Sequence, residues 1–181
     1  MTRRKLVAGN WKMNGSLAAL AELDTIAAVA RAHPAVDVSI ALPATLIAPA
    51  VQRVPGLAIG GQDVHAAESG AHTGCLSAAM LAEAGASFTI VGHSERRADQ
   101  GETSQDAWAK ASAAHRHGLG VILCVGETDA ERDAGRAARV VQAQIEKSVP
   151  DLATGAWLTL AYEPRWAIGT GRTPTLDEIE S

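Results

Sequence analysis

The chain of 181 residues is 47% hydrophobic and 20% charged, a composition typical of a globular protein with a substantial core. Its net charge of −4, without a long basic run, argues against nucleic acid or an anionic membrane as a partner. No apolar run reaches a membrane-spanning length and no signal-peptide pattern opens the chain, so we expect one cytoplasmic domain over residues 1–181.

Six short runs of apolar and β-branched residues predict strands, and helical patterns lie between most of them. The strands are expected at 6–9, 38–42, 57–60, 88–92, 121–125 and 157–162. The first helix is expected to begin at the N-cap Ser16 and to end near Pro34, with an apolar face made of Leu17, Leu20, Leu23, Ala27 and Ala30. A second helix follows Pro43.

Three further helices are expected at 77–85, 103–118 and 128–148. Their first residues, Ser77, Thr103 and Thr128, are good N-caps, and an acidic residue three positions after each threonine completes a capping box. The last of these helices is expected to be one long amphipathic helix.

Strands that alternate with helices predict βα units joined by right-handed crossovers, in either a doubly wound sheet or a (β/α) barrel. No Gly-x-Gly-x-x-Gly follows the first strand, which weakens the dinucleotide-binding sheet. Polar residues instead follow strands 1, 4, 5 and 6. Catalytic groups gathered from several strand ends favour a barrel.

Three strand ends carry a set of residues suited to proton abstraction next to a carbonyl. Asn10 and Lys12 follow the first strand, His93 and Glu95 the fourth, and Glu163 the sixth. A carboxylate base removes a carbon-bound proton while an imidazole and an ammonium stabilise the charge that grows on oxygen.

Each of these residues also has a purely structural interpretation. Lys12 could be a solvated surface lysine, and His93 a core histidine bonded to the backbone. Glu95 could pair with Arg96 or Arg97. We assign no chemical role to the remaining histidines, which are His33, His65, His72, His115 and His117.

The segments around these residues resemble the triosephosphate isomerase family. The matching motifs are Ala8-Gly9-Asn10-Trp11-Lys12-Met13-Asn14, Gly92-His93-Ser94-Glu95-Arg96-Arg97, Ala161-Tyr162-Glu163-Pro164 and Trp166-Ala167-Ile168-Gly169-Thr170-Gly171. Smaller matches occur at Gly61-Gln62-Asp63-Val64 and Cys124-Val125-Gly126-Glu127. The resemblance covers the chain from residue 4 onward and implies an α/β fold of the (β/α)8 TIM-barrel family.

The resemblance implies a role for each matching residue in the interconversion of dihydroxyacetone phosphate and glyceraldehyde 3-phosphate. Glu163 matches the base and His93 the neutral imidazole that exchanges protons with the enediolate oxygens. Lys12 matches the cation at the phosphate and the developing oxyanion, Asn10 a polar wall of the pocket, and Glu95 a supporting carboxylate.

The segment after Glu163 has the pattern of a closing lid. Pro164 stiffens its root, and two later glycines leave its far end free to swing. By resemblance, Gly169 is a lid residue whose backbone N–H reaches the substrate phosphate, and closure excludes water from the enediolate.

The resemblance implies no cofactor and no metal. The cysteines Cys75 and Cys124 lack metal-type spacing and are expected to be reduced thiols. The family is homodimeric through an interdigitating loop that matches the long loop from Gln62 to about Gly74. In this chain Cys75 stands where the family usually carries a glutamate that pairs with an arginine matching Arg96, so a weaker dimer is expected.

Two further features depart from the family. The chain carries six of the family's eight βα units, a (β/α)6 portion without strands 7 and 8, so we expect open edges at strands 1 and 6 and little or no activity from this portion alone. Thr175 with Glu178 would form a capping box for a last, short helix, and Arg165 replaces an aliphatic residue at the root of the lid.

Two rival functions use the same residues. The chain could bind phosphate ligands, or only assemble, without catalysis. Alternatively, Lys12 could be the nucleophile of a Schiff-base aldolase on the same fold, but such a lysine needs a desolvated pocket and Lys12 lies in a polar loop near Glu95.

Overall fold

The computed structural model describes residues 4–167, 173, 175 and 176. The six strands are β1 (Lys5–Asn10), β2 (Val36–Ala41), β3 (Ala58–Gly61), β4 (Phe88–Val91), β5 (Gly120–Val125) and β6 (Leu158–Tyr162). The helices are a 3-10 turn (Ala18–Ala21), α1 (Glu22–Ala32), α2 (Ala44–Arg53), α3 (Ala78–Glu83), α4 (Ser94–Asp99), α5 (Ser104–Arg116), α6 (Asp129–Asp133) and α7 (Ala137–Ser148). In the described part of the chain, no helix has the length and apolar character needed to cross a membrane.

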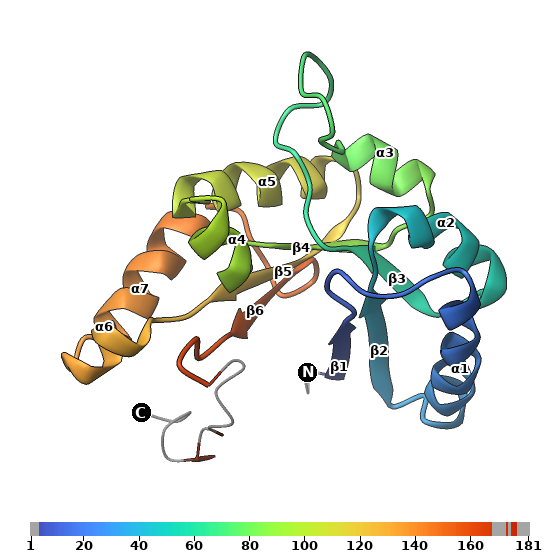
Figure 1. Ribbon diagram of the computed structural model, residues 1–181, viewed down its shortest axis with the longest axis horizontal. Coiled ribbons are helices and arrows are strands. Elements are labelled where there is room, and N and C mark those ends of the chain that lie inside the picture. The colour runs from blue at the N-terminus through green and yellow to red at the C-terminus, as the bar shows by residue number, and fades with distance from the viewer. Residues whose placement is uncertain (1–3, 168–172, 174, 177–181) are drawn as a thin grey trace.

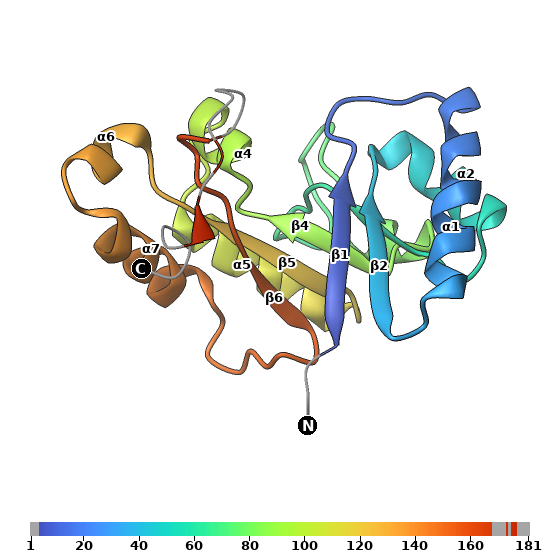
Figure 2. The same cartoon turned by 90° about the horizontal axis from the view of Figure 1, so that it is seen from below.

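All six strands are parallel and lie in the sheet in their sequence order, from β1 to β6. A doubly wound sheet would reverse its strand order at a switch point, so the sequential order decides between the two architectures in favour of the barrel. The sheet curls into part of a barrel, with the helices along its outer side (Figure 1; Figure 2).

Two apolar clusters hold the curled sheet, one on each face. The outer cluster packs the helices onto the sheet and includes Leu23, Ile47, Val91 and Leu123, all fully buried. The inner cluster consists of Ala41, Phe88, Ile90 and Cys124. Because side chains alternate along a strand, neighbouring residues of β4 and β5 supply both clusters, which explains why these central strands are apolar throughout.

The outer strands are less well covered than the central ones. Val7 on β1 is 60% exposed and Leu160 on β6 is 44% exposed. Within the described residues, β1 pairs only with β2 and β6 only with β5, which confirms the open edges expected at strands 1 and 6.

Most predicted strands and caps are confirmed, with boundaries shifted by a residue or two. Ser77 Oγ accepts the Met80 N–H, and Thr103 forms the expected capping box with Asp106. The expected start of the first helix is partly wrong. Ser16 Oγ does accept the Ala19 N–H, but the first turn is 3-10 and begins only at Ala18, so Leu17 precedes it as the N-cap and is 67% exposed.

The helix expected at 128–148 is two helices, α6 and α7, and the prediction of one long helix is wrong. The capping box of Thr128 and Glu131 forms as expected. However, Gly135 adopts φ +65°, a left-handed conformation that ends α6 after five residues. The predicted capping box of Thr175 and Glu178 lies largely outside the described residues.

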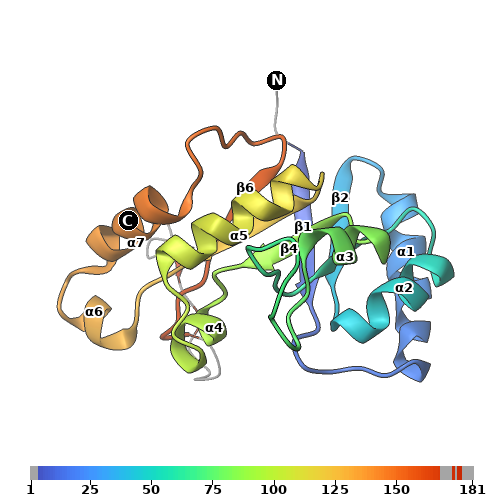
Figure 3. The ribbon, with the colours of Figure 1, turned by 90° about the horizontal axis from the view of Figure 1, so that it is seen from above.

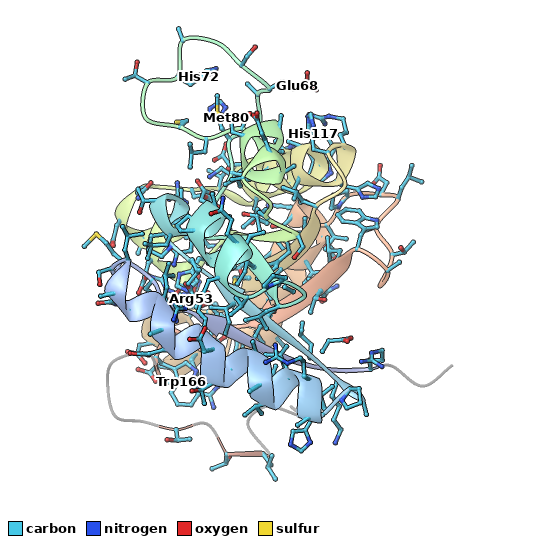
Figure 4. The ribbon with its side chains drawn as sticks, turned by 90° about the vertical axis from the view of Figure 1, so that its right-hand side faces the viewer. Arg53, Glu68, His72, Met80, His117 and Trp166 are labelled. Carbon is cyan, nitrogen blue, oxygen red and sulfur yellow. The ribbon has the colours of Figure 1, made fainter. Side chains whose placement is uncertain are left out.

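The loop between β3 and α3 projects from the body of the molecule above α3 and α5 (Figure 1; Figure 3). Within it the rings of His65 and His72 lie 4.1 Å apart. Glu68 on the same loop lies 3.6 Å from Nε2 of His117, beside the end of α5 (Figure 4). Both cysteines are free, Cys75 exposed in this loop and Cys124 buried on β5.

Replacing Gly135 by alanine should lower the free energy of unfolding by about 1 kcal/mol, because a Cβ is disfavoured at a left-handed φ. No atom lies within 4 Å of the position that this Cβ would occupy, so the loss would come from the backbone alone. Gly155, which is equally open but has no positive φ, is the matched control. Urea unfolding of Gly135→Ala and Gly155→Ala tests this, and equal stability of the two variants would contradict it.

Candidate active site

The residues predicted from the sequence lie together at the carboxyl end of the sheet, where they follow β1, β4 and β6. Glu163 directly follows β6, and its N–H donates to the Val125 carbonyl of β5. His93 follows β4 and is the N-cap of α4, while Asn10 ends β1 and Lys12 follows it. Gly126 must lack a side chain, because a Cβ there would overlap the backbone carbonyl of Glu163.

His93 and Glu163 are in direct contact. His93 Nε2 lies 2.8 Å from Glu163 Oε1, and the second carboxylate oxygen accepts the Ser94 N–H at 2.9 Å. On its other side, the His93 ring accepts the Glu95 N–H at Nδ1, 3.3 Å away. Since Nδ1 is an acceptor, the arrangement suits a neutral imidazole with its proton on Nε2, which donates to the carboxylate.

Glu163 is mostly buried, with a side chain 18% exposed. Burial alone would raise the pKa of this carboxyl group, but the hydrogen bonds from His93, the Ser94 N–H and the Cys124 thiol outweigh it and hold the pKa below its ordinary value. The group is therefore a carboxylate at neutral pH, the form that a general base needs.

Lys12 lies at the same carboxyl end of the sheet and has an unusual backbone conformation. Its φ is +51°, which makes it the one non-glycine residue with a positive φ in the described part of the chain. Asn10 Oδ1 accepts the Lys12 N–H at 2.9 Å, and the Gln62 side chain donates to both Asn10 Oδ1 and the Lys12 carbonyl. These bonds hold the backbone of Lys12 in this conformation.

Lys12 Nζ lies 2.6 Å from Glu95 Oε1, so these two residues form an ion pair across the site. The alternative that Glu95 pairs with Arg96 or Arg97 is wrong, because Arg96 binds Asp63 and Glu102 while Arg97 binds backbone carbonyls. An open cavity of about 330 Å³ lies beside this pair, and Asn10, Lys12, Gln62, His93 and Glu95 are among its lining residues. Gly169 lies outside the described residues.

The segment after Glu163 is tied to β5 and α6 through Glu127. Trp166 Nε1 donates to Glu127 Oε1 at 3.0 Å and the Tyr162 hydroxyl donates at 2.9 Å. The Arg132 guanidinium stacks over the Trp166 ring, 4.3 Å from its centroid, and Trp166 is 5% exposed. The root of the segment is therefore packed against the body of the molecule.

The chain is similar to known proteins over nearly its whole length. The family model of triosephosphate isomerase matches residues 5–181. The triosephosphate isomerase of Afipia carboxidovorans is 60% identical over 180 residues, which cover 98% of this chain and 72% of that protein. That of Dinoroseobacter shibae is 56% identical over 98% of this chain and 72% of its own length.

The chain belongs to the triosephosphate isomerase family. A crystal structure of triosephosphate isomerase from Bartonella henselae superposes with a TM-score of 0.87 at 44% sequence identity, covering 91% of this chain and 69% of that one. The chain is therefore an isomerase by family and has the TIM-barrel architecture, with six parallel strands of it present.

Several residues for which the sequence predicted no role hold the candidate site residues in place. Gln62 orients the Lys12 loop and Glu127 anchors Trp166, although both lie in the smaller motifs that match the family. The Ser94 N–H, which binds Glu163, could have been expected from its position at the start of a helix that follows His93.

The depressed pKa of Glu163 predicts a pH dependence of stability. A carboxyl group whose pKa is lower in the folded than in the unfolded state stabilises the fold above its unfolded pKa, here its ordinary value of 4.5. This contribution is lost as the pH falls from 4.5 through the folded pKa. Urea unfolding from pH 7 to pH 3 should therefore show that the wild-type chain loses stability relative to Glu163→Gln only below about pH 4.5. A constant difference across this range would contradict the depressed pKa.

Proposed function

We propose that the site interconverts dihydroxyacetone phosphate and D-glyceraldehyde 3-phosphate, with Glu163 as the base that moves a proton between the two carbons. The observation that carries the proposal is the contact of Glu163 Oε1 with His93 Nε2 at 2.8 Å. It brings a carboxylate and a neutral imidazole, the two groups that an enediolate mechanism needs, to one point. Family membership supports the same reaction.

In this mechanism the substrate enters between the base and the imidazole. The carboxylate leaves His93 and the Ser94 N–H and takes a proton from the carbon next to the carbonyl. The His93 Nε2–H then donates to the substrate oxygen on which charge develops, and the imidazole exchanges this proton between the two oxygens of the enediolate. Returning the proton from Glu163 to the neighbouring carbon completes the isomerisation, with no net gain or loss of atoms.

Lys12 and its neighbours form the proposed substrate-binding side. The ammonium of Lys12 is held toward the cavity by its backbone bonds and by Glu95, where it can bind a phosphate and stabilise the oxyanion. Asn10 lines the same cavity and orients Lys12, and Gly169 is proposed to bind the phosphate through its backbone N–H. The Lys12 side chain is 38% exposed and bonded to Glu95, whereas a Schiff-base lysine needs a desolvated pocket, so the geometry disfavours the Schiff-base aldolase.

The activity of the 181-residue chain by itself is proposed to be weak or absent, and residues 1–181 are proposed to form one domain. The exposed edge strands support the first proposal, because apolar positions such as Val7 and Leu160 lack the cover that a closed barrel gives. If the chain cannot turn over substrate, the non-catalytic alternative remains, in which the same cavity binds phosphate ligands.

Turnover of glyceraldehyde 3-phosphate by the purified chain, with Glu163→Ala as the blank, tests the proposed chemistry. Any turnover of the chain should fall at least about a thousandfold in Glu163→Ala, because the variant lacks the base. Calorimetric titration with a phosphate-bearing enediolate mimic should show binding that Lys12→Met weakens by about tenfold or more. Turnover that survives in Glu163→Ala would overturn the role of Glu163.

Self-association is proposed to be weaker than in the homodimeric family, because Cys75 is an exposed thiol and Arg96 is already bound by Asp63 and Glu102 of its own chain. Cys75→Glu should strengthen self-association by adding a carboxylate to the projecting loop, and sedimentation velocity measures this. Cys75→Ser is the matched control, because it removes the thiol without adding charge. An identical sedimentation profile for both variants would count against the proposal.

A further inference from the structure

Arg97 joins two strand ends at the candidate site through their backbone carbonyls. Its Nε donates to the Gly92 carbonyl at the end of β4, 2.7 Å away, and one terminal nitrogen lies 3.3 Å from the Cys124 carbonyl of β5. The other terminal nitrogen donates to Ser104 Oγ at 3.2 Å, at the start of α5. One guanidinium group therefore links three elements.

The two carbonyls are connected to the proposed catalytic residues through short stretches of backbone. Gly92 immediately precedes His93, and Cys124 immediately precedes Val125, whose carbonyl accepts the Glu163 N–H at 2.8 Å. The distance between the Gly92 and Cys124 carbonyls therefore contributes to the distance between the imidazole and the carboxylate. The Gly92 N–H is also held, by Glu102 Oε1 at 2.8 Å, so both polar groups of Gly92 are bound by charged side chains.

The Arg97 guanidinium lies so close to Gly92 that no side chain fits at this position. Gly92 has φ +70°, and a Cβ there would lie 2.8 Å from the Arg97 terminal nitrogen and 3.0 Å from the Cys124 carbonyl oxygen. A planar fork of donors can reach two carbonyls at once, whereas a lysine ammonium is a single point on a flexible stem.

Placing the charged guanidinium of Arg97 in this partly buried position costs free energy. Burial lowers the pKa of its guanidinium, and the charges of Glu102 and Glu163 act in the opposite direction. Among the described residues, no carboxylate lies within ion-pair distance of it, since Glu102 and Asp63 bind Arg96 and Lys110 instead. The cation therefore makes its direct contacts with backbone carbonyls and a hydroxyl group, which indicates a geometric role.

We propose that Arg97 is a positioning residue that holds His93 Nε2 at hydrogen-bond distance from the Glu163 carboxylate by bridging the Gly92 and Cys124 carbonyls. Its importance for catalysis rests on the proposed function, but its effect on the geometry of His93 does not. The role in catalysis and the effect on His93 geometry are tested by different measurements.

The first measurement is NMR of the 181-residue chain with ¹⁵N-labelled histidine, in which Glu163→Gln identifies the His93 Nε2–H signal. This proton should lie downfield and exchange slowly with water in the wild-type chain. In Arg97→Ala it should move upfield and exchange about tenfold faster or more, because the bond to Glu163 is loosened. Arg97→Lys should give an intermediate result, because an ammonium reaches one carbonyl.

Chemical rescue separates positioning from general stability. Millimolar guanidinium should restore the His93 signal of Arg97→Ala by refilling the site, and ammonium at the same ionic strength should not. Arg53→Lys is the matched control, because Arg53 pairs with Asp24 on the α1–α2 side of the molecule and should leave the signal unchanged (Figure 4).

An unchanged His93 signal in folded Arg97→Ala would overturn the proposal. Loss of cooperative unfolding in both Arg97→Ala and Arg97→Lys would also overturn it, since Arg97 would then be required for folding alone. If the wild-type chain shows turnover, kcat should fall in Arg97→Lys with little change in KM. If it shows none while the NMR result holds, the positioning role stands and only the proposed activity of this chain fails.

Discussion

The continuous parallel pairing of β4, β5 and β6 is the constraint on which the candidate site depends. In a parallel sheet all carboxyl ends lie at one edge, so residues far apart in the chain meet there. The Glu163 N–H bonds to the Val125 carbonyl, and this bond carries the pairing of β5 and β6 one residue beyond β6. His93 and Glu163 meet because β4 and β6 flank β5 on either side.

Backbone groups and charged side chains then hold His93 and Glu163 at hydrogen-bond distance. The first turn of α4 supplies N–H groups to both partners, the Ser94 N–H to Glu163 and the Glu95 N–H to the His93 ring. The short helix thus suits the Nε2–H tautomer of His93 and helps to lower the pKa of Glu163, through N–H groups that have no partner within the helix. Tethering by a helix end is precise because its N–H groups have fixed directions.

A buried ionic network lies behind α4 and supports it. Arg96 and Lys110 each bind both Asp63 and Glu102, and Glu102 is almost inaccessible to solvent. Burial by itself would raise the pKa of both carboxyl groups. For Glu102, the bonds to Lys110 and Arg96 outweigh this effect, whereas Asp63 keeps a raised pKa because burial dominates there. Such a network stabilises the fold only while every member keeps its partners, which ties the loop after β3 to the site.

The sequence by itself determined the strands, most helix caps and the family of the chain, because these depend on short-range patterns and motifs, and it predicted the residues of the candidate site. The caps at Ser77, Thr103 and Thr128 are examples, since a side-chain oxygen and an N–H three residues later are close in any helix. Only the tertiary structure decided that α6 ends at Gly135, that Leu17 is exposed, and that Glu95 pairs with Lys12. It also revealed the bonds that Arg97 and Gln62 make at the site, because a bond to a backbone carbonyl of a distant segment leaves no local pattern in the sequence.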